Sequence, residues 1–129
     1  MESFSLSTGA GTSFEDITDE VINATRRLGL SEGLCCVYVP HTTAAVTINE
    51  NADPSVCRDI VMELGKLIPQ QDGYEHMEGN SAAHIKSTLV GESVFVPISD
   101  GNLKLGTWQG IYFCEFDGPR TRKVQVTAG

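Results

Sequence analysis

Two tight-turn signals in the second half of the chain constrain its fold more than any other feature. Asp100-Gly101 is a dipeptide that favours a two-residue hairpin, and Asp117-Gly118-Pro119 turns the chain again. Strands joined by such short turns pair antiparallel. The strands around these turns are expected at residues 93–99, 102–105, 107–116 and 120–127. The second half therefore predicts a mainly antiparallel sheet.

The first half of the chain mixes strands with helices. Ser13-Phe14-Glu15-Asp16 has the pattern of a capping box and predicts a helix that runs from there to Gly29. Asp53-Pro54 predicts the start of a second helix that Pro69 stops, and Ser81 is expected to cap a third helix over 82–89. Further strands are expected at residues 3–8, 34–39 and 44–48.

About seven strands and three helices result from these patterns. Strands that precede and follow helices without strict alternation indicate the α+β class, with helices packed on one side of a sheet. The 129 residues contain no repeat and no linker-like stretch, so we expect one domain over 1–129.

The charge and hydropathy of the chain exclude two classes of partner. Its net charge is −8, and an acidic protein repels the phosphate backbone, so we expect no nucleic-acid partner. No apolar run approaches the ~20 residues of a membrane span, so we expect no membrane association.

The four cysteines indicate a reducing compartment. Cys35, Cys36, Cys57 and Cys114 lie in apolar contexts and form no C-x-x-C pair, which favours reduced core residues. The N-terminal residues lack the basic and apolar regions of a signal peptide. We therefore expect a cytoplasmic protein.

The only three histidines are His41, His76 and His84. His41 follows a predicted strand, His76 lies in the polar segment 70–80, and His84 lies on the third helix. Imidazole is both a frequent metal ligand and the usual general base near neutral pH. Their spacing matches no metal motif, so the fold must assemble any site. Ordinary surface or core roles remain the alternative.

The long strand predicted at 107–116 carries a second signal. Ile111, Phe113 and Glu115 share one face with Thr107 and Gln109, because side chains alternate along a strand. On the other face, Gly110 marks either the close approach of another group or a bulge.

Arg120 and Arg122 are expected to point the same way on the last strand. Two parallel guanidinium groups suit a phosphate or a carboxylate ligand. Ion pairs with Glu115 or Asp117 are the structural alternative. Glu50 follows the strand at 44–48 and has no evident structural role there, whereas Asp53 is more readily explained as a helix cap.

Four segments together resemble a known family, the YjbQ-like proteins, which are also called the secondary thiamine-phosphate synthase family. The segments are 41–54 (HTTAAVTINENADP), 74–87 (YEHMEGNSAAHIKS), 106–111 (GTWQGI) and 115–122 (EFDGPRTR), and the resemblance covers residues 3–128. It implies an α+β sandwich on a largely antiparallel sheet, with about three helices packed on it. It also implies a homotrimer with sites near the subunit boundaries.

The resemblance extends to individual site residues. It implies a divalent metal, zinc or magnesium, held by His41, His76 and His84. The substrate-binding residues it implies for a small phosphorylated molecule are Lys86, Thr107, Arg120 and Arg122, and the candidate catalytic residues are Glu50, Glu75 and Gln109. Glu50 or Glu75 would orient a histidine.

The implied activity is that of a thiamine-phosphate synthase. This reaction joins a pyrimidine diphosphate to a thiazole phosphate and releases pyrophosphate, either as the main or as a side activity. A metal-dependent hydrolase uses the same site residues and is one alternative. A non-catalytic trimeric module that binds a small anionic metabolite is another, and in a third the histidines only bond across a subunit interface.

Overall fold

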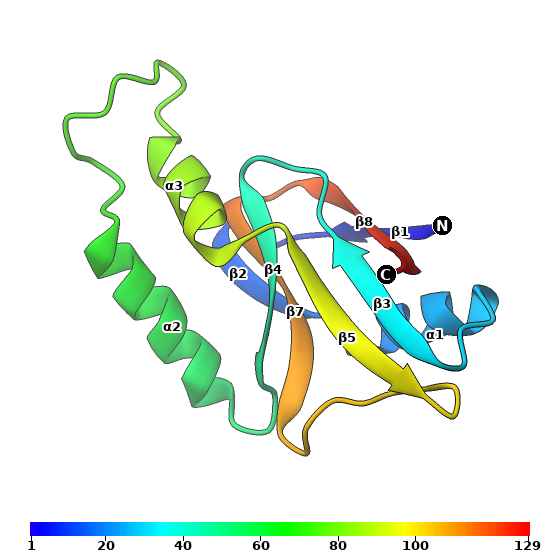
Figure 1. Cartoon of the computed structure of the whole chain (residues 1–129). Coiled ribbons are helices and arrows are strands. Elements are labelled where there is room, and N and C mark those ends of the chain that lie inside the picture. Colours follow the sequence, from blue (N-terminus) through cyan, green and yellow to red (C-terminus); the bar gives the residue numbers. More distant parts are fainter.

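Eight strands form two antiparallel sheets, and three helices lie against them (Figure 1). The computed structural model describes residues 1–129. One sheet has the order β1-β8-β3-β5-β6, formed by Glu2–Ser7, Thr121–Ala128, Gly33–Tyr38, Ser93–Ser99 and Asn102–Leu103. The other has the order β2-β7-β4, formed by Gly11–Asp16, Gln109–Gly118 and Ala44–Glu50. The predicted α+β class with a mainly antiparallel sandwich is confirmed.

Strand β7 separates two apolar clusters, because its side chains alternate between its faces. Ile111 and Phe113 are fully buried in the larger cluster, which lies between the two sheets. Tyr112, Cys114 and Phe116 belong to a smaller cluster on the other side of the three-stranded sheet. The face assignments made from the sequence are therefore confirmed.

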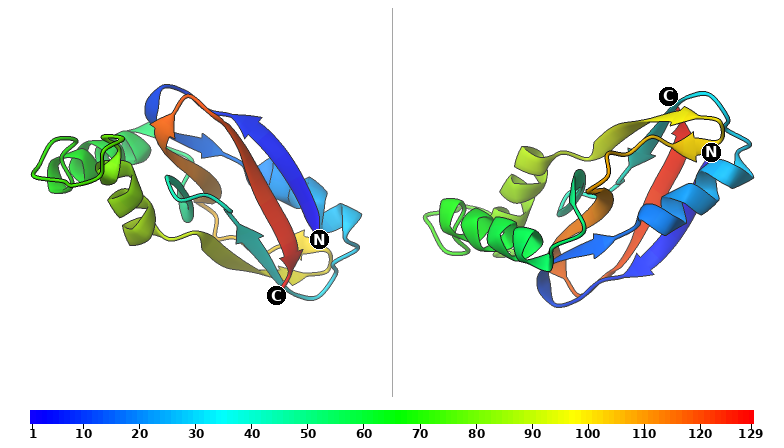
Figure 2. Two further views of the ribbon diagram at one scale, coloured as in Figure 1. Left: turned by 90° about the horizontal axis from the view of Figure 1, so that it is seen from above. Right: turned by 90° about the horizontal axis from the view of Figure 1, so that it is seen from below.

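The three helices cover different parts of this sandwich. Helix α1 (Thr18–Arg27) packs against β1, β8 and β7, and helix α3 (Ser81–Val90) packs against β4 and β7. Helix α2 (Pro54–Leu67) buries no residue completely. Figure 2 shows α2 and α3 together on one side of the molecule and α1 at the opposite end. The expectation that all helices pack on one side of a sheet is therefore wrong, because α1 packs into the larger cluster and α3 into the smaller one. None of these helices is long and apolar enough to cross a membrane.

Two local signals in the sequence are confirmed by the backbone. The carboxylate of Asp53 accepts a hydrogen bond from the Ser55 N–H at 2.9 Å and so caps α2. Asp100 and Gly101 both have positive φ, 53° and 74°, and connect β5 to β6 as a two-residue hairpin. All four cysteines are free, but only Cys35 and Cys114 are buried.

The predicted helix start at Ser13 is wrong, because residues 11–16 form strand β2. Phe14 pairs with Cys114 on β7, and its ring lies 6.2 Å from Tyr112 and 6.3 Å from Phe116. The capping-box pattern therefore describes an edge strand whose apolar side chain packs into the smaller cluster. The helix begins only at Thr18, whose N–H donates to Asp16 Oδ1 at 2.9 Å.

Two smaller expectations differ from the structure, and the structure decides between the two alternatives of a third. Ser81 is the first residue of α3, and no side chain caps the helix. Strand β6 ends at Leu103, because the next position faces Pro97, which has no N–H to donate. At Gly110 the pairing with β4 has no bulge, and the close approach is that of the Asn51 side chain, whose Nδ2 lies only 2.5 Å from where a Cβ would lie.

Three segments cross from one sheet to the other at the same end of the sandwich. They connect β1 to β2, β3 to β4 and β7 to β8. The Thr8 N–H donates to the Arg120 carbonyl at 2.9 Å, and the Phe116 N–H donates to the Thr43 carbonyl at 3.2 Å. These bonds fasten the three crossings together. The candidate site lies at this end.

Candidate functional site

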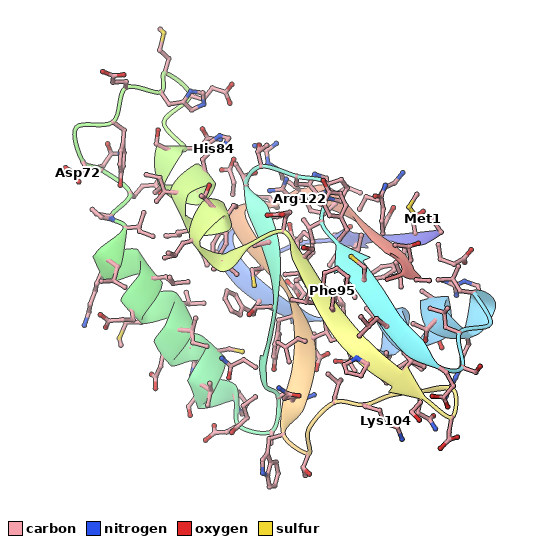
Figure 3. The ribbon with its side chains drawn as sticks, viewed as in Figure 1. Met1, Asp72, His84, Phe95, Lys104 and Arg122 are labelled. Carbon is pink, nitrogen blue, oxygen red and sulfur yellow. The ribbon has the colours of Figure 1, made fainter.

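A cavity of about 470 Å³ opens where the chain crosses between the sheets. No hydrophobic side chain lines it, and it gathers all three histidines with both candidate arginines. We call it the histidine–arginine cavity. Its lining residues are Pro40, His41, Thr42, Thr43, His76, Glu78, Asn80, His84, Asp117, Arg120 and Arg122. Figure 3 labels His84 and Arg122 at this end of the molecule.

His41 is held in one orientation by strand β8. Its Nε2 accepts a hydrogen bond from the Lys123 N–H at 2.9 Å, so a neutral His41 carries its proton on Nδ1. Burial and the nearby charge of Arg122 lower the pKa of His41 below its ordinary value. His41 is therefore neutral at pH 7 and offers a hydrogen-bond donor.

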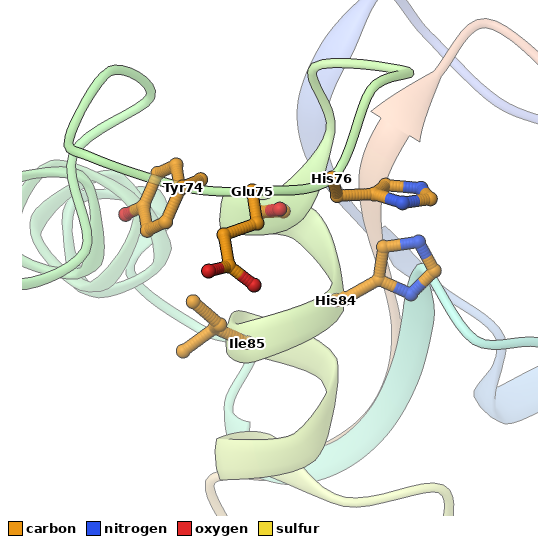
Figure 4. Close-up of a pocket in the computed structure, with 6 residues that line it drawn as sticks. Tyr74, Glu75, His76, His84 and Ile85 are labelled. Atoms are coloured by element: carbon orange, nitrogen blue, oxygen red, sulfur yellow. The ribbon is translucent and has the colours of Figure 1, made fainter.

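His76 and His84 form a pair. Their ring centroids lie 5.3 Å apart with an interplanar angle of 87°. His76 comes from the loop between α2 and α3, and His84 lies in the first turns of α3, so the α3 start brings the two rings together. Figure 4 shows them edge to face beside that helix.

Arg122 is fixed by the buried carboxylate of Glu115. Arg122 Nε donates to Oε1 of Glu115 at 2.8 Å and Nη2 donates to Oε2 at 2.5 Å. Nη2 also donates to the Thr43 hydroxyl at 2.8 Å. These bonds use Nε and Nη2, so Nη1 is the nitrogen left for the cavity that Arg122 lines.

Glu115 remains ionised although its side chain has no exposed surface. Burial raises its pKa, but hydrogen bonds from Arg122, Thr8 and the Asp117 N–H outweigh burial and lower the pKa. The Thr8 hydroxyl donates to Glu115 at 2.6 Å and accepts from the Arg120 N–H at 3.0 Å. One carboxylate thus ties the β1–β2 crossing to the β7–β8 crossing.

Arg120 is paired in a similar way, at the surface. Its Nη2 donates to Asp117 Oδ2 at 2.9 Å, and Asn80 Nδ2 donates to the same oxygen at 2.9 Å. Both ion pairs that the sequence allowed as the structural alternative are therefore formed. Anion binding must use the N–H groups that these pairs leave free. Asn80 Oδ1 is buried without a partner beside the same cavity.

A second cavity of about 410 Å³ adjoins the first (Figure 4). It contains the predicted catalytic residue Glu75. Its lining residues are Tyr74, Glu75, His76, Ser81, His84 and Ile85. His76 and His84 line both cavities, so the histidine pair stands between them.

The three histidines fit a metal site only in part. No group of three or more His, Cys, Asp or Glu side chains lies close enough to hold a metal ion. Nε2 of His41 is already used by Lys123, and its other nitrogen carries the proton. His76 and His84 are the two imidazoles that stand close enough to share a ligand.

The structure places four other predicted site residues away from the cavity. Glu50 pairs with Gln109 at the far end of β4 and β7, next to Thr107. The length of β4 separates these residues from the histidine–arginine cavity by roughly 20 Å within one chain. Lys86 is on α3 but is only 8 % exposed and lines neither cavity.

Sequence reasoning did not select the acidic and amide groups that organise the site. Glu115 and Asp117 enter the sequence analysis only as possible ion-pair partners of the arginines, and Thr43 and Asn80 are not among the predicted site residues. A usable signal existed for Glu115: a carboxylate alternates there with Ile111 and Phe113 on a core-facing side of a strand, so it needed a buried cation.

Comparisons with known proteins agree on one family. The family model described as "UPF0047 protein YjbQ-like" matches residues 2–129. A UPF0047 protein of Methanocaldococcus jannaschii is 51% identical over 123 residues, which cover 95% of this chain and 89% of that protein. The UPF0047 protein YugU of Bacillus subtilis is 52% identical over 112 residues, covering 86% and 85%.

Solved structures give the same result. A YjbQ/UPF0047 family protein from Clostridium acetobutylicum superposes with a TM-score of 0.97 at 53% identity, covering 100% of both chains. A hypothetical protein from Aeropyrum pernix gives a TM-score of 0.93 at 39% identity, covering 99% and 96%. Sequence and fold thus agree: this chain belongs to the YjbQ-like UPF0047 family.

Proposed function

We propose that this protein is an enzyme that acts on a small phosphorylated substrate bound in the histidine–arginine cavity. One observation carries the proposal: a single polar cavity, without hydrophobic lining, gathers three histidines and two arginines from four separate segments. Core packing does not require such a gathering, because polar groups are costly to assemble unless they are used or paired.

The free donors of the cavity suit a phosphate group. Arg122 presents Nη1, and Arg120 is half exposed with N–H groups beyond those given to Asp117. His41 adds its Nδ1–H. Guanidinium donors bind phosphate oxygens in a fixed fork, and a neutral imidazole adds a donor without further charge.

Catalysis is assigned to the histidine pair. His76 and His84 stand at the edge of the cavity, where one of them is placed to give or take a proton at the reacting bond. When pyrophosphate leaves, negative charge builds on it, and the arginine N–H groups aimed into the cavity stabilise that charge. The thiamine-phosphate synthase reaction implied by the family resemblance is the first reaction to assay.

A divalent metal bound by His76 and His84 is the alternative assignment for this pair, because an imidazole nitrogen that binds a metal no longer takes a proton. Two imidazoles favour zinc over magnesium, which prefers oxygen ligands. A bound zinc ion would polarise a phosphate oxygen or a water molecule. Elemental analysis of the purified protein beside His84→Ala tests the site. About one metal per chain, lost in the variant, supports it, and metal-free wild type after zinc exposure contradicts it.

We also propose a homotrimer in a reducing compartment such as the cytoplasm. The family resemblance implies the trimer. The exposed side chains of Leu34, Tyr38 and Phe95 on the β3–β5 face provide apolar surface for subunit contact. The four free cysteines favour a reducing environment.

Calorimetric titration with pyrophosphate tests the binding step. Arg120→Ala should weaken binding about 10–100-fold, because charge-assisted hydrogen bonds to phosphate are lost. Arg26→Ala removes the same charge from α1, remote from the cavity, and should leave binding unchanged. Equal affinities for both variants and wild type would refute the assignment of the cavity.

Product analysis tests the chemistry. Wild type incubated with the pyrimidine diphosphate and the thiazole phosphate should release pyrophosphate and form the joined product, and His84→Ala should not. Free phosphate without joining would indicate the hydrolase instead. Binding of both compounds without any turnover would favour the non-catalytic module.

A further inference from the structure

We infer, on the basis of the function proposed above, that the substrate is a phosphate ester of a compact ring-containing group, and that it spans both cavities. Its phosphate would occupy the histidine–arginine cavity, and its ring the second cavity, which we call the tyrosine cavity. The reacting bond would then lie at the His76–His84 pair.

The first support is the way the two cavities adjoin. They have His76 and His84 in common and no other lining residue. The rings are 5.3 Å apart, so a ligand that enters both cavities must pass these two imidazoles. The two imidazoles therefore lie at the boundary between the two parts of such a ligand.

The second support is the contrast in lining. The histidine–arginine cavity has no hydrophobic side chain, whereas the ring of Tyr74 and the aliphatic side chain of Ile85 line the tyrosine cavity. Figure 4 shows Tyr74 beside Glu75 and Ile85 on the helix below it. A volume of about 410 Å³ is in the range of small-molecule sites. An organic ring can make apolar contact with Tyr74 and Ile85, whereas a phosphate gains no hydrogen bond or ion pair from them.

The third support is charge, which determines which cavity holds the phosphate and which holds the ring. The carboxylate of Glu75 lies in the tyrosine cavity, which has no arginine or lysine. It disfavours a phosphate there, while Arg120 and Arg122 favour one on the other side. Glu78 and Asp117 also line the arginine side, but Asp117 is paired with Arg120.

Tyr74 is also held in place for this role. Its hydroxyl donates to the Pro69 carbonyl at 2.6 Å, which anchors the ring against the end of α2. An anchored ring loses little conformational freedom when a ligand packs against it, and aromatic contact adds to the affinity.

Calorimetric titration with two probes tests this inference on the full chain. Inorganic phosphate fills only the arginine side, and phenyl phosphate adds a ring. Wild type should bind phenyl phosphate about 5–10-fold more tightly, because a ring packs against Tyr74 and Ile85. Ile85→Ala should remove most of this advantage and leave the affinity for inorganic phosphate unchanged.

Matched variants distinguish a failure of the proposed function from a failure of the two-cavity substrate alone. Leu89→Ala removes an exposed apolar side chain from the same helix, outside both cavities, and should change neither affinity. Arg120→Ala should weaken both probes. If it weakens neither, the proposed function fails. If it weakens both while Ile85→Ala changes neither, or if wild type does not prefer phenyl phosphate, the cavity binds phosphate but the two-cavity substrate is wrong.

Discussion

At the scale of single residues, Glu115 is the buried charge that holds the cavity together. It accepts hydrogen bonds from Thr8, Asp117 and both Nε and Nη2 of Arg122. A fully buried ion pair of this kind adds little stability by itself, because desolvation offsets the attraction. What it does provide is a fixed direction for the remaining guanidinium nitrogen.

We predict that Glu115→Gln lowers the free energy of unfolding by about 3–5 kcal/mol, because Arg122 keeps a buried charge without its partner. Urea unfolding at pH 7 measures this. The double variant Glu115→Leu/Arg122→Met removes both charges and should be much closer to wild type in stability. A Glu115→Gln protein as stable as wild type would contradict this role.

The same pair sets a pH dependence. The pKa of Glu115 is lower in the folded than in the unfolded chain, where it is about 4.3. Its contribution to stability is therefore complete above that unfolded value and is lost as the pH falls through the folded value. The stability difference between wild type and Glu115→Gln should shrink in urea unfolding series below about pH 4. A difference that stays constant there would exclude this linkage.

Lys86 is a different case, a largely buried side chain whose charged end has no protein partner. It is 8 % exposed and forms no hydrogen bond or ion pair in the chain, and burial lowers its pKa. We predict that Lys86→Met stabilises the protein by about 1 kcal/mol or less at pH 7, because the ammonium is only partly desolvated. The gain should decline as the pH rises toward the unfolded lysine pKa of about 10.4, because wild-type Lys86 then loses its charge. A destabilised Lys86→Met would show that the lysine has a partner in the assembled protein.

The importance of these residues could be only partly predicted from the sequence. The three histidines are scarce and chemically distinctive, so they were selected, and one cavity contains them all. Glu115 was harder to rank, because alternation places it on the core face but does not say which of nine basic residues reaches it. That information lies in the β7–β8 crossing, which is a property of the fold.

At the scale of elements, two glycines are expected to respond in opposite ways to substitution by alanine. A Cβ on Gly118 would lie 1.9 Å from the Gly9 carbonyl oxygen, whereas a Cβ on Gly65 of α2 would meet nothing within 4 Å. We predict that Gly118→Ala destabilises the fold by about 1–3 kcal/mol through overpacking of two crossings. Gly65→Ala should stabilise it by about 0.5–1 kcal/mol, because alanine favours the helix. Urea unfolding of both variants checks the opposite signs.

Strand β2 shows why local patterns misassigned one element. The capping-box residues and the apolar spacing from Phe14 onward satisfy a helix, and Ile17, Val21 and Ala24 do form its buried face. Phe14 instead packs with Tyr112 and Phe116, nearly one hundred residues later in the chain. Tertiary packing of that kind overrides local propensity and cannot be predicted from the neighbouring residues in the sequence.

At the scale of the whole molecule, the exposed apolar side chains predict assembly. We expect light scattering to give three times the 13.9 kDa of one chain, because subunit contact buries apolar surface on the β3–β5 face. The mass should be constant over a tenfold dilution. A mass of 13.9 kDa throughout would contradict the trimer.

The crossings between the sheets also couple ligand binding to folding. The groups that line the histidine–arginine cavity come from positions 40 to 122, and they meet only after both sheets have closed. A partly folded chain therefore has no binding site, and every ligand of the cavity favours complete folding. At a concentration of about 100 times its dissociation constant, a ligand adds about 2.7 kcal/mol to the free energy of unfolding. The melting temperature of this protein thus reports the binding of its own substrate. A library of phosphorylated metabolites can be ranked by the rise in melting temperature that each compound causes.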